Sequence, residues 1–126
     1  MHIGHSFISC DVRFHFDSLA HDNSAISQNV LSVVAATSTQ GDTPAPVLLH
    51  GTQSVPKFNS VEPDEVQILL ALYRVESKNV DLVMSMNIPT KSADGGAISV
   101  AGLTDAQRVF EIAAPSLKIV DYGLFT

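Results

Sequence analysis

Five histidines are the residues in this sequence that could most readily bind a metal ion: His2, His5, His15, His21 and His50. None of them forms the His-x-x-x-His or His-Glu-x-x-His spacing that places two imidazoles on one face of a helix. His2 and His5 are three residues apart, but Gly4 between them disfavours a helix. We therefore expect surface histidines, with His15 on the outward side of a strand, and no metal site.

Other residue types that support catalysis occur without the neighbours that catalysis needs. Residues 2–5 spell the His-Ile-Gly-His motif with which class I aminoacyl-tRNA synthetases hold ATP phosphates, but that motif has to follow a strand. The glycine pair at 95–96 is not followed by the Lys-Ser/Thr of a phosphate-binding loop. No Gly-x-Ser-x-Gly sequence marks a nucleophilic serine. The acids Glu62, Asp64 and Glu65 are typical of a solvated loop before a strand. The sequence thus predicts no enzyme and no cofactor.

Length and charge narrow the class of protein. We assign residues 1–126 to a single domain, with residues 1–10 as a leader of uncertain structure. The net charge is −6 and no basic patch is visible, which argues against a nucleic-acid partner. No apolar run reaches the roughly 18 residues of a membrane-spanning helix. Cys10 is the only cysteine and no signal peptide is recognisable, so we expect a protein of the nucleus and cytoplasm.

Alternating apolar and polar residues predict a sheet. Val12, Phe14 and Phe16 alternate with polar residues, which is the period of a half-buried strand. Further strands are expected, in chain order, over residues 29–35, 47–55, 65–75 and 81–88. The third of these is apolar on both faces, which predicts a central strand. Asn79 in the turn that follows it can adopt a left-handed conformation.

One helix is predicted near the end of the sequence. Thr104 can cap its N-terminus, and Gln107 three residues later completes a capping box. The apolar residues that follow recur at the spacing of one helical face: Ala106, Val109, Phe110 and Ala113. Pro115 should end this helix, and residues 117–125 should form a last strand. Strands followed by a helix and a strand predict an α+β fold with a largely antiparallel sheet.

Four segments carry more specific information, in the order 13–17, 51–59, 70–89 and 110–125. The first reads Arg-Phe-His-Phe-Asp, and the second reads Gly-Thr-Gln-Ser-Val-Pro-Lys-Phe-Asn. The third contains Leu-Tyr-Arg-Val, then Asp-Leu-Val and Asn-Ile-Pro. The fourth has Phe-Glu, then Leu-Lys-Ile and a closing Asp-Tyr-Gly-Leu-Phe. Together these segments resemble the Ran guanine nucleotide release factor family, the Mog proteins.

The resemblance spans residues 11 to 125 and carries expectations about fold and function. It implies an antiparallel sheet sandwiched between helices, an architecture shared with the PsbP proteins of photosystem II. It also implies binding to the small GTPase Ran, release of its guanine nucleotide and support of nuclear protein import, with no catalytic side chain. A PsbP-like accessory subunit and an unrecognised small-molecule enzyme are the alternatives.

The chain departs from the family at its start. Family members have a first hairpin, an acidic stretch and a helix before the Arg-Phe-His-Phe block, and only residues 1–10 stand in their place here. The family's acidic contacts with Ran are thought to lie in that stretch, so none of them can be assigned here. Either the chain has been shortened artificially, or it is a genuine short form that no longer binds Ran. We expect a domain without its N-terminal hairpin and helix, which could self-associate through an uncovered sheet edge.

Four polar residues in the matched segments are candidate contacts with a partner: Gln53, Lys57, Asn59 and Arg74. Lys57 and Asn59 follow a strand in a loop that should be exposed. A structural role is the alternative for both, with Asn59 shaping a turn and Lys57 simply solvated. Asp81 and Asn87 are expected to make hydrogen bonds at strand ends, and Phe14, Phe16, Leu72, Phe110 and Phe125 are expected in the core.

Overall fold

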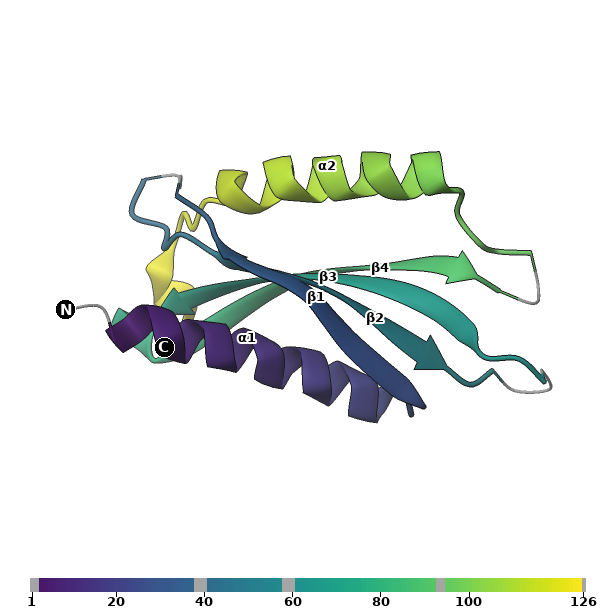
Figure 1. Cartoon of the computed structure of the whole chain (residues 1–126). Helices are drawn as coiled ribbons and strands as arrows, with labels where there is room; N and C mark the ends of the chain where they lie inside the picture. The colour runs from purple at the N-terminus through teal and green to yellow at the C-terminus, as the bar shows by residue number, and fades with distance from the viewer. Residues whose placement is uncertain (1–2, 38–40, 58–60, 93–94, 126) are drawn as a thin grey trace.

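A four-stranded antiparallel sheet between two helices makes up the domain (Figure 1). The computed structural model describes residues 3–37, 41–57, 61–92 and 95–125. Each strand pairs with the next along the chain: β1 (Ser27–Ala35), β2 (Val47–Val55), β3 (Asp64–Val75) and β4 (Val80–Lys91). Helix α1 (Ile3–Asp22) covers one face of the sheet, and helix α2 (Val100–Ser116) lies over the other. The predicted α+β class with a largely antiparallel sheet is confirmed.

Strand β3 divides the core in two because its successive side chains point to opposite faces. Ile68, Leu70 and Leu72 pack toward α1, in a cluster with Val12, Phe16, Val47 and Leu49. Leu69, Ala71 and Tyr73 pack toward α2, in a cluster with Ile88, Phe110 and Ala114. The prediction of a central strand buried on both faces is confirmed.

Helix α1 corrects the expectation for the start of the chain. The predicted strand through Val12, Phe14 and Phe16 is part of this helix, and so are most of the residues assigned to a leader. At helical spacing Val12 and Phe16 fall on one face and are buried, whereas Phe14 turns away and is 65% exposed. The expectation of a domain with no N-terminal helix is therefore wrong, and so is the placement of Phe14 in the core.

The long hairpin of β3 and β4 forms as predicted. A single 3₁₀ turn, η1 (Glu76–Lys78), joins the strands, and Asn79 closes it in the left-handed conformation with φ of 55°. The predicted strand at 81–88 extends to Val80–Lys91. Strand β1 has a bulge between Val30 and Ser32, after which its pairing with β2 is regular again.

The end of the chain differs from the prediction in three ways, the first being that Pro115, which was expected to end the helix, lies inside it. Helix α2 begins earlier, because the side chain of Ser99 caps it by accepting a 3.1 Å hydrogen bond from the backbone of Gly102. Thr104, the predicted cap, lies inside the helix. The predicted strand over 117–125 is wrong: the segment instead ends in a 3₁₀ turn, η2 (Tyr122–Phe125). Its backbone is held by the loop before β2, where Thr43 accepts a 2.9 Å hydrogen bond from the amide of Ile119.

Candidate partner-binding site

Gln53 is enclosed between α1 and β2. Gln53 is only 2% exposed. The amide nitrogen donates a 3.2 Å hydrogen bond to the carbonyl of Phe16, and the amide oxygen accepts a 3.3 Å bond from Asn23. These bonds fix the C-terminal half of α1 on the sheet. Gln53 therefore has no free surface for a partner, and its role is to hold the fold together.

Lys57 lies at the surface just beyond the end of β2. Its ammonium group is 3.2 Å from Asp64 Oδ2 at the start of β3, and 3.5 Å from the hydroxyl of Ser92 just after β4. The side chain is 40% exposed, so the charge is accessible from solvent while its position is restrained. Asn59, the second candidate in this loop, lies outside the described residues.

Arg74 joins three elements through its guanidinium group. It makes a two-pronged contact with Asp81, directly across the β3–β4 ladder, with bonds of 2.6 Å from Nε and 3.1 Å from Nη2. Nη2 also donates to Asp11 on α1. His15, one turn further along α1, has its Nε2 3.6 Å from Asp81 Oδ2. We call these four residues the Arg74 network.

Within the Arg74 network, Arg74 and Asp81 each favour the charged form of the other. The hydrogen bonds that Arg74 donates to Asp81 and Asp11 raise its pKa above the usual value, and burial opposes this only in part. The guanidinium group in turn holds the pKa of Asp81 below its usual value. A hollow of about 280 Å³ adjoins Arg74 and is lined by further polar groups from Asp42, Glu76, Ser77 and Tyr122. The network thus presents carboxylates at one end of the sheet.

Sequence reasoning identified only part of this network. Arg74 was named as a candidate contact, and Asp81 as a residue that makes a structural hydrogen bond. The antiparallel hairpin already places these two opposite one another. Asp11 and His15 were missed as partners because their segment was assigned to a strand. A helical assignment would have shown them four residues apart on one face.

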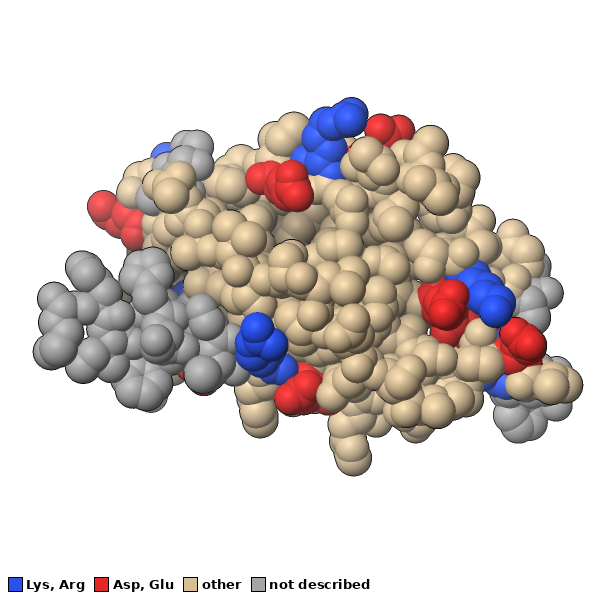
Figure 2. All heavy atoms as spheres, in the orientation of Figure 1, with Lys and Arg blue, Asp and Glu red and all other residues tan. Residues whose placement is uncertain are grey.

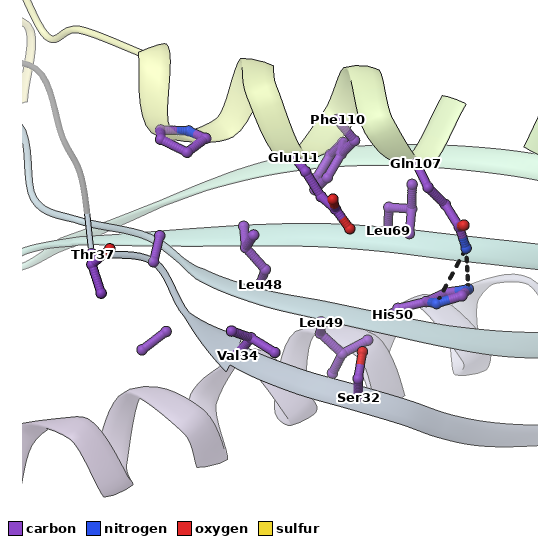
Figure 3. A pocket seen from close by; sticks show the side chains of 13 residues that line it. Ser32, Val34, Thr37, Leu48, Leu49, His50, Leu69, Gln107, Phe110 and Glu111 are labelled. Atoms are coloured by element: carbon purple, nitrogen blue, oxygen red, sulfur yellow. Dashed lines mark hydrogen bonds between the residues drawn. The ribbon is translucent and has the colours of Figure 1, made fainter. Parts of the chain in front are cut away.

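A groove opens between α2 and the β1–β2 half of the sheet (Figure 3). It has a volume of about 530 Å³. Its floor is apolar, with Val34, Leu48 and Leu69 from three neighbouring strands. At one end the ring of His50 lies between two amides: Nε2 is 2.5 Å from Gln67 Oε1, and Nδ1 is 3.4 Å from Gln107 Nε2. The groove thus has an apolar floor, with polar groups of His50 and Gln107 at one end and of Ser32, Thr37 and Glu111 elsewhere in its lining.

Neither a metal site nor a membrane-spanning helix is found in the described part of the chain. No three His, Cys, Asp or Glu residues among those described come close enough to hold a metal ion. None of the described helices combines the length and the apolar character needed to cross a membrane.

Comparison with known proteins gives the family. A family model described as the Ran-interacting Mog1 protein matches residues 7–89, which include most of α1 and nearly all of the sheet. The chain belongs to the Mog1 family. The resemblance that the four segments suggested is therefore confirmed, and Lys57 and the Arg74 network lie within the matched residues. Helix α2, which forms one wall of the groove, lies beyond them.

Two curated relatives of this Mog1-family chain align with 90% of its residues. The Ran guanine nucleotide release factor of Danio rerio is 29% identical over 126 aligned positions. The probable Ran guanine nucleotide release factor of Dictyostelium discoideum is 25% identical over 128. The alignments cover 67% and 66% of these relatives, so the chain spans about two thirds of their length. No solved structure matches the chain.

Proposed function

We propose that this chain binds the small GTPase Ran and promotes release of its guanine nucleotide, in support of nuclear protein import. Membership of the Mog1 family carries the proposal, because the matched residues span α1 and nearly the whole sheet. The excess of acidic residues, with a net charge of −6, suits a partner that presents a basic surface. The protein would act in the nucleus and cytoplasm, where Ran and its cargo complexes meet.

No catalytic side chain is needed for this activity. A protein that binds nucleotide-free Ran more tightly than nucleotide-bound Ran must weaken nucleotide binding by the same factor, because the two binding equilibria are coupled. Rigid surfaces that fit one state of the GTPase are enough. The restrained positions of Lys57 and of the Arg74 network give such surfaces at two places on the domain.

The direct test measures nucleotide release from Ran. Ran loaded with a fluorescent GTP analogue is mixed with the chain and excess unlabelled GTP, and the loss of fluorescence is followed. We expect release to be about tenfold faster than in buffer, within the usual range of coupling between two ligands. Ras loaded with the same analogue should be unaffected. A release rate from Ran equal to that in buffer would rule out the proposal for this chain.

A pair of lysines provides a matched test of the contact surface. Lys57 and Lys91 each make an ion pair of 3.2 Å, with Asp64 and Glu62 respectively. Only Lys57 belongs to the segment at 51–59 that carries the family resemblance. Lys57→Ala should slow Ran nucleotide release, whereas Lys91→Ala should leave it unchanged. Equal effects of the two substitutions would remove Lys57 from the contact surface.

A further inference from the structure

Among the described residues, β1 is an edge strand of the four-stranded sheet, and it lacks most of the usual protection of an edge against pairing. Natural edge strands are commonly guarded by charged side chains, proline, bulges or short length. The nine residues of β1 include no Lys, Arg, Asp, Glu or Pro. The one protective feature is the bulge between Val30 and Ser32, which leaves Ser32 to Ala35 in regular pairing. This second half of β1 is therefore the part that is open to an added strand.

The hydrogen-bonding groups of this half can be assigned from the ladder. Ala36 donates a 2.9 Å hydrogen bond to the carbonyl of Pro46, so its backbone points inward, toward β2. Backbone direction alternates along an antiparallel strand. Val33 and Ala35 consequently turn their N–H and C=O groups outward, away from the sheet. Two residues with outward-facing groups allow a short extended segment to pair in a defined register.

The groove beside α2 adjoins the second half of β1. Ser32 and Val34 point into it from β1, opposite Gln107, Phe110 and Glu111 of α2. Val34 is 58% exposed although it adjoins an apolar floor. Figure 2 shows that the surface over β1 carries no charged side chains at its centre and that charges lie around its margins. An added strand would cover this apolar surface with every second side chain.

The charge of the residues that line the groove distinguishes between the possible partners that could bind there. Glu111 is the only Asp, Glu, Lys or Arg among the described residues that line the groove, which also include His50. A second copy of this chain would bring an uncharged β1 and a net charge of −6, and so would leave Glu111 without a partner. A lysine or arginine on the added strand has a stem long enough to extend past β1 into the groove, where it can approach Glu111.

We propose that the β1 edge from Ser32 to Ala35, together with the groove beside α2, binds an extended segment of a partner protein. The segment carries apolar residues and a lysine or arginine on the side that faces α2. Main-chain bonds to Val33 and Ala35 supply affinity, and the groove supplies specificity. This proposal is independent of nucleotide release, since it concerns the binding of an extended peptide segment and is tested without Ran.

The test uses a fluorescent peptide, Thr-Val-Thr-Lys-Thr-Val-Thr-Lys-Thr, in which valine and lysine share one face of a strand. We expect saturable binding by fluorescence anisotropy, at peptide concentrations below about 1 mM. A peptide with glutamate in place of lysine should bind about tenfold more weakly, because it brings a like charge to Glu111. Absence of saturation, or equal binding of the two peptides, would overturn the proposal.

Variants of the chain locate the site. Ala35→Pro removes an outward-facing N–H without removing a bond to β2, and should weaken binding about tenfold. Glu111→Lys should also weaken it about tenfold, and should reverse the preference between the two peptides. Asp105→Lys is the matched control, because it makes the same change of charge on α2 outside the groove. If Asp105→Lys acts as strongly as Glu111→Lys, the binding is non-specific and the proposal fails.

Two further measurements separate folding and self-association from peptide binding. Circular dichroism should show that Ala35→Pro keeps the helix and sheet content of the unmodified chain. If Ala35→Pro loses that content, Glu111→Lys serves as the test of the site. Sedimentation equilibrium should show a monomer in the absence of peptide. A dimer that Ala35→Pro dissociates, and that peptide does not displace, would assign the edge to a second copy and contradict the proposal.

Discussion

The hydroxyl of Tyr73 in β3 donates a 2.6 Å hydrogen bond to the carbonyl of Ala114 in α2. Ala114 lies in the last turn of the helix, and its carbonyl also accepts a longer hydrogen bond, of 3.4 Å, from the backbone amide of Leu117. Both residues are almost completely buried, so water cannot easily replace the hydroxyl. The central strand thus satisfies the C-terminal end of the helix that covers it.

Removal of this hydroxyl should destabilise the domain. Tyr73→Phe leaves the Ala114 carbonyl without its buried donor, which should lower the free energy of unfolding by about 1–2 kcal/mol. Urea denaturation followed by circular dichroism gives the measurement. Tyr122→Phe is the control, since that hydroxyl bonds to the carbonyl of Asp42 at the surface. A loss for Tyr122→Phe as large as that for Tyr73→Phe would contradict this account of the helix end.

Tyr73 should also make stability depend on pH in the alkaline range. Burial raises the pKa of Tyr73 above its usual value of 10.0. The folded state therefore holds the phenolic proton more tightly than the unfolded state. The corresponding stability is fully present below about pH 10 and is lost as pH rises through the folded-state pKa. The free energy of unfolding should fall more steeply from pH 9 to 11 than it does in Tyr73→Phe. Parallel curves for the two proteins would refute this.

The Arg74 network should stabilise the domain at neutral pH and fail in acid. The Arg74 guanidinium lowers the pKa of Asp81, so the stabilisation exists above the unfolded-state pKa and is lost as pH falls through the lower folded-state value. Asp81→Asn should cost about 1 kcal/mol at pH 7 in urea denaturation. The cost should largely disappear by about pH 2.

An exposed pair on α2 provides the control for Asp81. Asp105 and Arg108 form an ion pair of 3.4 Å with both side chains well exposed. Asp105→Asn should change the free energy of unfolding by no more than a few tenths of a kcal/mol at either pH. If Asp81→Asn behaves in the same way, the Arg74 network adds nothing to stability beyond an ordinary surface pair.

Gly51 should not tolerate a side chain. A Cβ atom there would lie 2.6 Å from two ring atoms of Phe16 and 2.9 Å from the carbonyl oxygen of Asn29. Gly51→Ala should therefore lower the free energy of unfolding by about 1–3 kcal/mol. Combining it with Phe16→Leu should cost less than the sum of the two single substitutions, because the smaller side chain relieves part of the clash. Additive losses would show that Phe16 is not the obstacle.

The sheet could be predicted from sequence because its signals are local. Residues 47–55 and 65–75 have the composition and length of strands. The turn at 76–79 shows that the strand after it pairs with residues 65–75 in a hairpin. Residues 117–125 lacked that support. Their apolar content suggested a strand, but the backbone amide of Ile119 bonds to Thr43 in a loop far away in the sequence, which no local pattern reveals.

Helix α1 was missed because Val12 and Phe16 fit two periods at once. Residues four apart share a face in a strand and also in a helix. Phe14 favoured the interpretation as a strand, because it adds an apolar residue at every second position. Leu19 and Ala20, however, continue the apolar series of Val12 and Phe16 at helical spacing. Both residues lie against the sheet in the structure. This assignment also decided the site, because Asp11 and His15 reach the Arg74 network only from a helix.

The same sheet has a consequence for the order in which the chain can fold during synthesis. Helix α1 is translated before the sheet, yet Val12 and Phe16 are buried by residues 47–72, which leave the ribosome only later. The apolar side of the helix has no partner of its own chain during that interval. A nascent chain arrested before β3 would therefore expose this side to chaperones, whereas one arrested after β4 could already enclose it.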